Sequence, residues 1–273
     1  MIKNMVFIPG FEKCGTTTLH WWLNQVTDIC ASYPKEPQYF ERHYWQGVRF
    51  YFDNYFSHCE GQKFKLDSRP RNSIVPYVVD RIAESCSAPK FIFTIREPAE
   101  RAYSAWAHFK RMRPGRETLS FREAVTANME HYKRIKSRSI SDGGEQFSSE
   151  AEYLTNLDPA GGTYDRMYVQ GGLYDIHIKR FIERFGKENV MVITLDDMRD
   201  SPRAVLSAVI EFIGAEDDSD INYAAYNVGE KPVLDEAASD AMYLLQNYYS
   251  KSVDWSYLSS ICDFDFSSNW GYK

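Results

Sequence analysis

The feature that most constrains the fold is a glycine-bounded loop near the N-terminus, set between an apolar run and a helical pattern. Residues 4–9 are typical of a buried strand, and residues 19–25 are typical of a helix. Between them lies a hydroxyl-rich loop bounded by Gly10 and Gly15. Glycines let the backbone approach an anion closely, and a helix N-terminus directs N–H groups at it. The segment therefore predicts a phosphate-binding loop at the start of an α/β fold.

This loop departs from the Walker A motif at one position. The spacing of Gly10 and Gly15 matches G-x-x-x-x-G, but Thr16 stands where Walker A has its lysine, and the loop's own lysine comes earlier, as Lys13. A triphosphate site without that lysine is poor, whereas one lysine and the threonines at 16–18 suit a smaller dianion with no obligatory Mg²⁺. Because glycine loops are common, an ordinary turn between strand and helix is a nearly equal alternative.

Strand and helix patterns alternate along the rest of the chain. Further strands are predicted at 29–32, 63–67, 90–95 and 190–195, and helices at 45–56, 74–86, 99–112, 121–135, 173–185, 202–213 and 235–249. This alternation predicts an α/β fold with a P-loop-like, mainly parallel sheet and helices on both faces. Ligands of such sheets bind at the carboxyl ends of the strands. The polar residues expected there are Lys13, Glu36, Ser68 and Arg96.

The alternation loosens between about residues 113 and 170. This stretch contains Gly143-Gly144, Gly161-Gly162 and several serines, with one amphipathic helix pattern. We expect one domain over residues 1–273, with the stretch as an excursion over the active face and not a second domain.

Composition indicates which kinds of binding partner and which cellular compartment to expect. The net charge of −6 disfavours nucleic acid as a general partner. No apolar run reaches membrane-spanning length and no signal peptide precedes the first strand, so a cytoplasmic protein with no membrane span is expected. The five cysteines are scattered, odd in number and without a CxxC pair, which favours a reducing compartment and argues against a zinc or other metal site.

A second anion site is predicted after the strand at 90–95. Arg96 stands at its end, and Ser104 follows in the next helix. Arginine supplies a planar fork of donors and serine a short hydroxyl donor, so the two side chains can converge on one phosphate. We expect Arg101, on the other side of that helix, to be structural and to form a salt bridge. Two separate anion sites suit a nucleotide that carries phosphate on both ends of its ribose.

Three motifs in order carry a resemblance to a known family. They are Lys-Cys-Gly-Thr-Thr at residues 13–17, Glu-Pro-Gln-Tyr-Phe at 36–40, and Arg-x-Pro-x-x-Arg-Ala-Tyr-Ser at 96–104. With these motifs the chain resembles the sulfotransferases that use 3′-phosphoadenosine-5′-phosphosulfate (PAPS), and it is most similar to the carbohydrate branch, the type that sulfates heparan sulfate. The likeness covers most of residues 5–214.

The resemblance implies in-line transfer of a sulfuryl group from PAPS to a hydroxyl or amine, without a metal. Glu36 is then the general base, and Lys13 stabilises the leaving oxygen. The remaining cofactor ligands it implies are Cys14, Gly15, Thr16, Thr17 and Thr18 for the 5′-phosphate, Arg96 and Ser104 for the 3′-phosphate, and Lys231 in place of a late basic motif.

The acceptor implied by the resemblance is a carbohydrate or a similar glycan. Two residues are candidates for contacting it: His108, one helical turn after Ser104, and the aromatic Trp45. For both, a role in packing is the alternative. One departure from the heparan branch is Asp67, which stands where that branch often has a lysine.

Two other functions compete with sulfuryl transfer. A P-loop kinase acting on a small molecule would require Mg²⁺ and a lysine at position 16, which is Thr16 here. A binding protein that keeps the nucleotide fold without chemistry is the second alternative, and the presence of both Glu36 and Lys13 speaks against it.

Overall fold

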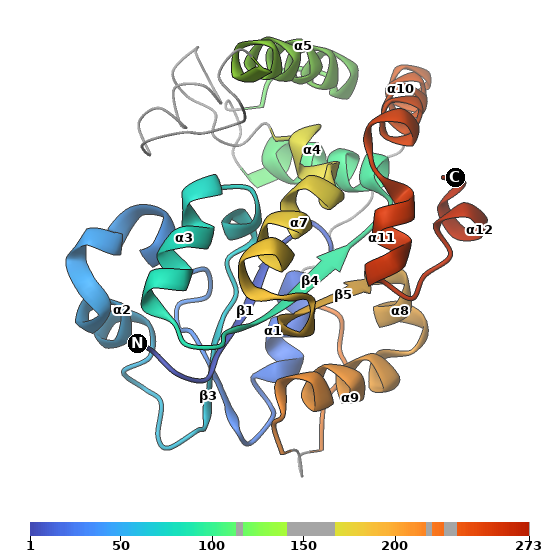
Figure 1. Cartoon of the computed structure of the whole chain (residues 1–273). Coiled ribbons are helices and arrows are strands. Elements are labelled where there is room, and N and C mark those ends of the chain that lie inside the picture. Colours follow the sequence, from blue (N-terminus) through green and yellow to red (C-terminus); the bar gives the residue numbers. More distant parts are fainter. Residues whose placement is uncertain (113–116, 141–166, 217–219, 227–233, 273) are drawn as a thin grey trace. The chain divides into compact units, whose positions relative to one another are not determined.

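In the computed structural model, the described residues are 1–112, 117–140, 167–216, 220–226 and 234–272 (Figure 1). They fall into two compact units, each made of separate stretches of the chain. Unit 1 comprises residues 1–96, 177–228 and 257–264, and unit 2 comprises residues 97–176, 229–256 and 265–273. The expectation of one domain with an excursion at 113–170 stays a prediction, since residues 113–116 and 141–166 lie outside the described part.

Unit 1 is built on a five-stranded parallel sheet in the order β2-β3-β1-β4-β5. The strands are β1 (Met5–Gly10), β2 (Ile29–Ala31), β3 (Phe64–Asp67), β4 (Lys90–Ile95) and β5 (Val190–Thr194). In the central strand, Val6 aligns with Leu66 of β3 on one side and with Lys90 of β4 on the other. Parallel strands place all their carboxyl ends at one edge, so the segments that follow the five strands share that edge. The predicted parallel α/β sheet is confirmed.

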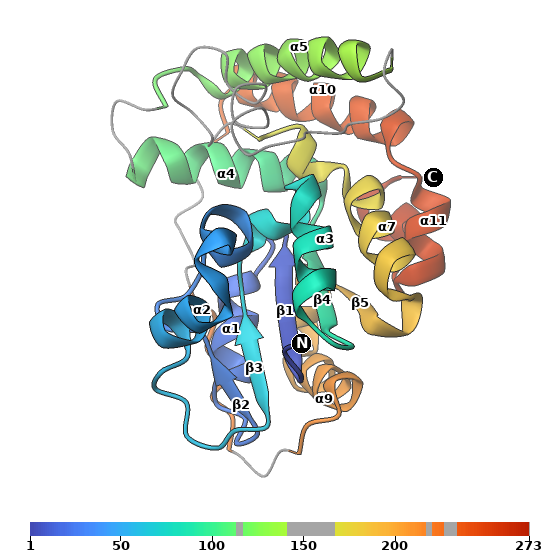
Figure 2. The same ribbon diagram turned by 60° about the vertical axis from the view of Figure 1, so that its left-hand side comes forward.

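Helices cover both faces of this sheet, as predicted. The helices that lie wholly or mostly in unit 1 are α1 (Thr16–Leu23), α2 (Gly47–Tyr55), α3 (Pro76–Ser85), α7 (Tyr174–Phe185), α8 (Leu195–Asp200), α9 (Pro202–Ile213) and α11 (Trp255–Ile261). Figure 2 shows α1 and α9 behind the strands and α3 and α7 in front of them. The short helices α8 and α11 lack the apolar periodicity of a longer helix and are not predicted from the sequence.

The side chains of β1 alternate between the two faces, which fixes the layers. Val6 is buried in an apolar cluster with Trp22 of α1 and Val209 of α9. Phe7 points the other way and stacks on Phe91 of β4, with 5.4 Å between ring centroids. Burial on both faces explains why the strands are continuous apolar runs.

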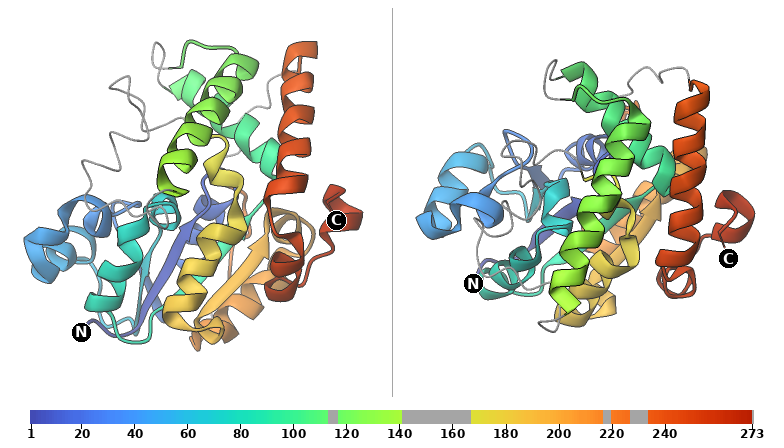
Figure 3. Two further views of the ribbon diagram at one scale, coloured as in Figure 1. Left: turned by 45° about the horizontal axis from the view of Figure 1, so that its top comes forward. Right: turned by 90° about the horizontal axis from the view of Figure 1, so that it is seen from above.

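Unit 2 contains α4 (Pro98–Met112), α5 (Phe121–Ile140), α10 (Glu236–Ser252) and α12 (Phe266–Trp270) (Figure 3). Helix α10 packs against both α4 and α5. Arg101 is buried in this unit and donates from Nη2 to the carbonyl oxygens of Met167 (3.1 Å) and Tyr168 (2.6 Å). The Arg101 side chain is thus structural, as expected. From the sequence we expect it to form a salt bridge, whereas these two hydrogen bonds go to backbone carbonyl oxygens. None of the helices in the described ranges is both long and apolar enough to cross a membrane.

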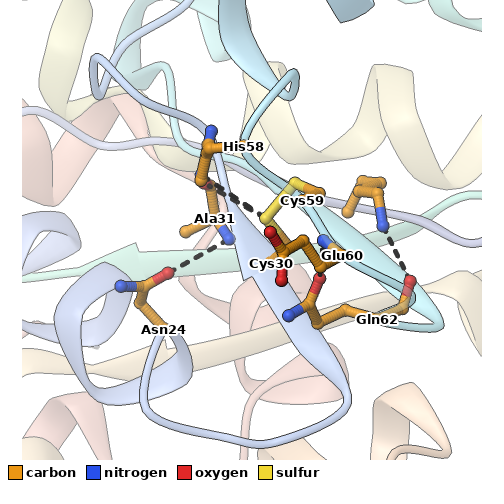
Figure 4. Close-up of a disulfide and its surroundings, with 8 residues drawn as sticks. Asn24, Cys30, Ala31, His58, Cys59, Glu60 and Gln62 are labelled. Atoms are coloured by element: carbon orange, nitrogen blue, oxygen red, sulfur yellow. Dashed lines mark hydrogen bonds between the residues drawn. A yellow bond between two sulfur atoms is a disulfide. The ribbon is translucent and has the colours of Figure 1, made fainter.

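Cys30 of β2 and Cys59, which follows α2, form a disulfide (Figure 4). Scattered cysteines, from which the sequence analysis argues to a reducing compartment, do not predict this disulfide. The two residues are 29 positions apart, and β2 lies beside β3, the strand that begins shortly after Cys59. Strand order brings the two thiols together, and strand order cannot be read from cysteine spacing.

Candidate active site

The glycine loop joins β1 to α1 in a conformation that requires both of its glycines. Gly15 caps α1 with a left-handed backbone (φ 91°), and a Cβ there would lie 2.9 Å from Leu195 Cδ1. A Cβ on Gly10 would lie 2.5 Å from Ser73 Oγ. No acidic residue lies in the first turn of α1 and no side chain caps it. Because the first N–H groups of a helix have no partner within the helix, the loop presents donors suited to an anion.

Lys13 and Glu36 share an unusual backbone conformation. Their φ angles are +67° and +68°, and they are two of four non-glycine residues with positive φ in the described chain. For a residue with a Cβ this region costs on the order of 1–3 kcal/mol, and such residues cluster at functional sites. The strain supports a functional role for both residues, which the sequence analysis selects on other grounds.

The threonines of the loop differ in how available their hydroxyls are. Thr18 is buried, and its hydroxyl donates to the carbonyl oxygen of Tyr226 (3.2 Å) and accepts from the Tyr226 N–H (3.1 Å). Thr16 is also buried, and Thr17 is only partly buried. The Thr18 hydroxyl therefore serves to dock residues near 226, and its backbone N–H is the group left to face an anion at the helix N-terminus.

Glu36 lies at the carboxyl edge of the sheet between two cations. Lys35 donates from Nζ to Oε1 (3.0 Å), and Arg69 donates from Nη1 to Oε2 (3.2 Å). Burial alone raises the pKa of this carboxyl, but the charges of Lys35 and Arg69 outweigh it and lower the pKa below its ordinary value. The Glu36 side chain is 42% exposed, so a ligand can reach it. The site thus holds an ionised, accessible carboxylate at neutral pH.

Arg69 is itself held by a second carboxylate, Glu41. Nε of Arg69 donates to Glu41 Oε2 at 2.9 Å, and Nη2 donates to the same oxygen. Glu41 is fully buried and Arg69 nearly so. A buried ion pair is costly to break because removal of one partner leaves an uncompensated charge. Arg69 is therefore a fixed bridge between Glu41 and Glu36.

His20 lies beneath the same edge as a neutral imidazole. Its Nδ1 is 2.9 Å from Ser68 Oγ, and its side chain is almost completely buried. Burial, with the nearby charge of Lys35, lowers the pKa of His20 to about 3. His20 therefore has a packing role, and its bond to Ser68 ties α1 to the end of β3.

Asp67 faces into the protein and does not take the place of the family's lysine. It is fully buried and accepts a hydrogen bond from the Tyr51 hydroxyl (2.6 Å). Burial raises the pKa of Asp67 to about 7, against the lowering effects of the Tyr51 bond and Arg69. The cation beside Glu36 at this strand end is Arg69, two residues further along the chain.

The other predicted site residues are distributed as follows. Arg96 directly follows β4 in unit 1 and is mostly buried, whereas Ser104 and His108 lie on α4 in unit 2 and are partly buried. Trp45 is 81% exposed and donates from Nε1 to the carbonyl oxygen of Arg42 (3.2 Å). The convergence of Arg96 and Ser104 on one phosphate stays a prediction. Lys231 lies outside the described residues.

Comparison with known proteins decides the family. The model of the sulfotransferase domain matches residues 3–227. The chain belongs to the sulfotransferase family. A solved sulfotransferase from Alicyclobacillus acidocaldarius superposes with a TM-score of 0.72 at 23% identity, covering 98% of each chain, and this likeness supports the fold alone.

Several relatives carry names that refer to heparan sulfate. The human bifunctional heparan sulfate N-deacetylase/N-sulfotransferase 1 is 25% identical over 227 residues, which are 77% of this chain and 22% of the relative. Mouse heparan sulfate glucosamine 3-O-sulfotransferase 3A1 is 24% identical over 76% of this chain and 44% of its own length. The membrane-associated sulfotransferase kil1 of Dictyostelium discoideum is 24% identical over 92% of this chain and 64% of its own. The chain thus spans about a fifth of the N-deacetylase/N-sulfotransferase that it matches.

Sequence reasoning missed the Arg69–Glu41 pair. The one available signal is that Ser68-Arg69-Pro70 follows a strand, which places an arginine at the carboxyl edge. Nothing in the spacing of residues 41 and 69 reveals that they meet. The pairing depends on the segment after β2 lying beside the end of β3.

Removal of Arg69 is expected to destabilise the fold through Glu41. Arg69→Met leaves that carboxylate buried without this counter-ion, so we expect the free energy of unfolding to fall by about 3–5 kcal/mol in urea titrations at pH 7. Arg49→Met is the matched control, because its partner Asp53 and Arg49 itself are exposed, and a loss of at most about 1 kcal/mol is expected. The double variant Arg69→Met/Glu41→Met should recover much of the loss. Equal losses for Arg69→Met and Arg49→Met would contradict the bridge.

His20 should make the protein less stable in mild acid. In the unfolded chain this imidazole has its ordinary pKa of 6.5, whereas in the folded chain the pKa is about 3. The free energy of unfolding therefore falls as the pH is lowered from 6.5 towards 3. At pH 5 the loss from His20 is about 2 kcal/mol relative to pH 7. His20→Gln should remove that component of the pH dependence in denaturant titrations, while Ser68→Ala should keep it. An unchanged pH dependence in His20→Gln would refute the assignment.

Proposed function

We propose that this chain transfers a sulfuryl group from PAPS to a hydroxyl or amine of a carbohydrate-like acceptor by in-line displacement. Membership of the sulfotransferase family and the names of the heparan sulfate relatives support this reaction class. The observation that carries the proposal is the ionised Glu36 carboxylate, held between Lys35 and Arg69 at the sheet edge that also bears the glycine loop.

The reaction requires a base for the acceptor, in-line placement of the reacting atoms, and stabilisation of the leaving phosphate oxygen. Glu36 is the proposed base. Its two bonds to Lys35 and Arg69 use only part of its capacity, because a carboxylate has about four lone-pair sites. The lowered pKa keeps the Glu36 carboxylate ionised, so that it can accept a proton. The same lowered pKa makes Glu36 a weaker base.

PAPS would supply the sulfuryl group and a bisphosphorylated leaving nucleotide. The glycine loop fits its 5′ end, because Gly15 permits close approach and the first turn of α1 has no acidic residue to repel an anion. The N–H groups at residues 15–18 are the proposed 5′-phosphate ligands, and Lys13 is the proposed cation for the leaving oxygen. The expected Cys14 N–H is not among them, because it donates to the carbonyl oxygen of Phe11 (3.2 Å). Neither role needs a metal ion.

The 3′-phosphate is assigned to Arg96 and Ser104, with Lys231 as a further cofactor ligand. For the acceptor, His108 and the exposed Trp45 are the proposed contacts. An exposed indole offers a flat apolar face of the kind on which a sugar ring can stack.

The two alternatives receive less support. A kinase would need a lysine in place of Thr16, and the family match is to sulfotransferases. Against a binding protein without chemistry stands the presence of both the proposed base, Glu36, and the proposed cation, Lys13.

Replacement of Glu36 tests the base directly. Glu36→Gln keeps the shape of the side chain but cannot accept a proton, so we expect turnover with PAPS and heparan-type oligosaccharides to fall about 10²–10⁴-fold. Binding of adenosine 3′,5′-bisphosphate, measured by calorimetry, should stay within about twofold of wild type, because the proposed nucleotide ligands are untouched. Glu216→Gln, at an exposed position, is the control and should keep full activity. Loss of binding together with turnover would contradict the assignment.

A further inference from the structure

Three side chains with metal-binding atoms meet at the edge strand of the sheet, and the proposed reaction uses none of them. They are Cys30 of β2, and His58 and Cys59 from the segment between α2 and β3. Their ligand atoms all lie within 4.8 Å of one another. His58 Nε2 is 3.5 Å from Cys30 Sγ and 3.1 Å from the carbonyl oxygen of Ala31. Figure 4 shows the imidazole of His58 turned toward the sulfur pair.

We propose that Cys30, His58 and Cys59 form a redox-controlled zinc site. In the oxidised chain the two sulfurs are joined as the disulfide. In the reduced chain two thiolates and His58 Nε2 bind Zn²⁺, and water occupies the fourth position. The proton that Nε2 donates to the carbonyl oxygen of Ala31 moves to Nδ1, which leaves the Nε2 lone pair for the ion.

A dithiol can serve as the reductant that opens the disulfide. The dithiol delivers two electrons and two protons to the Cys30–Cys59 bond and becomes a disulfide itself. Two free thiols result. Zn²⁺ then displaces one proton from each thiol on binding, since the thiolate is the ligand.

The ligand set and its setting favour zinc. Sulfur and imidazole nitrogen are the usual ligands of Zn²⁺, and three protein ligands with water in the fourth position are the arrangement found in catalytic zinc sites, Cys₂His among them. The Cα atoms of Cys30 and Cys59 are 5.9 Å apart, close enough for both sulfurs to reach one ion after reduction. His58 is exposed and Cys59 partly so, which gives an ion access from solvent.

The remaining described cysteines, Cys14, Cys86 and Cys262, are not disulfide-bonded and occupy separate places in the chain. Burial raises the pKa of the Cys86 thiol, and likewise that of Cys262, to about 12. Such thiols stay protonated near neutral pH and are poor metal ligands.

The site also lies on the chain segment that leads to Glu36. Strand β2 ends at Ala31, and the N–H of Tyr33 donates to the carbonyl oxygen of Tyr55 at the end of α2 (2.9 Å). Either the disulfide or the bound ion therefore fastens β2 to the segment after α2, a few residues before the Glu36 loop.

Metal retention tests the proposal without any measurement of sulfotransferase activity. The full chain is reduced with a phosphine, desalted without oxygen, mixed with one equivalent of Zn²⁺ or Co²⁺, and desalted again. We expect one metal ion per reduced chain by elemental analysis, thiolate-to-cobalt charge-transfer absorption with Co²⁺, and no retained metal in the oxidised chain.

Variants locate the ligands. Cys59→Ser should abolish retention, and His58→Ala should weaken the affinity for Zn²⁺ by at least about tenfold. Cys86→Ala, a buried cysteine outside the cluster, should retain metal as wild type does. Circular dichroism confirms that each reduced variant is folded. The proposal is overturned if the reduced wild type retains no more metal than the oxidised chain, or if Cys59→Ser retains as much as Cys86→Ala.

Discussion

The bridge from buried Glu41 through Arg69 to Glu36 is the interaction on which the candidate site depends. Glu41 has no exposed surface, so its charge must be compensated inside the protein, and Arg69 does this while extending one more N–H to Glu36. The Glu36 carboxylate at the sheet edge thereby acquires a fixed position, and the charges of Lys35 and, to a lesser extent, Arg69 lower its pKa. The same contact joins the segment after β2 to the end of β3. It therefore holds two neighbouring loops together and also positions the proposed base.

The parallel sheet explains why these groups meet. Five strands end at one edge, and the loops that leave β1, β2, β3 and β4 carry Lys13, Glu36, Arg69 and Arg96 respectively. Each loop supplies a different requirement of the proposed transfer: a cation for the leaving oxygen, a base, a positioning group for that base, and a ligand for a second phosphate. The strain at Lys13 and Glu36 is offset by the packed strands and helices beneath them.

Local sequence patterns predicted the five strands and the longer helices, and with them the sheet edge at which the candidate site is proposed. The glycine loop, the apolar strands and the motif residues are each readable within a few positions, and the parallel sheet with helices on both faces is confirmed. Contacts that depend on strand order could not be read in this way. Glu41 with Arg69, Cys30 with Cys59, and Thr18 with Tyr226 join residues 28, 29 and 208 positions apart. The roles proposed for the site residues stay predictions until ligands are bound.

Nucleotide selectivity tests the central claim, that this edge binds a nucleotide phosphorylated at both ends of its ribose. Thermal or chemical unfolding of the chain would be measured with adenosine 3′,5′-bisphosphate in the presence of a chelator, with adenosine 5′-phosphate, and with ATP and Mg²⁺. We predict stabilisation by the bisphosphate alone without metal, about 2.7 kcal/mol at a hundred times its Kd, and far less from the monophosphate. Stabilisation only by ATP with Mg²⁺ would contradict the account.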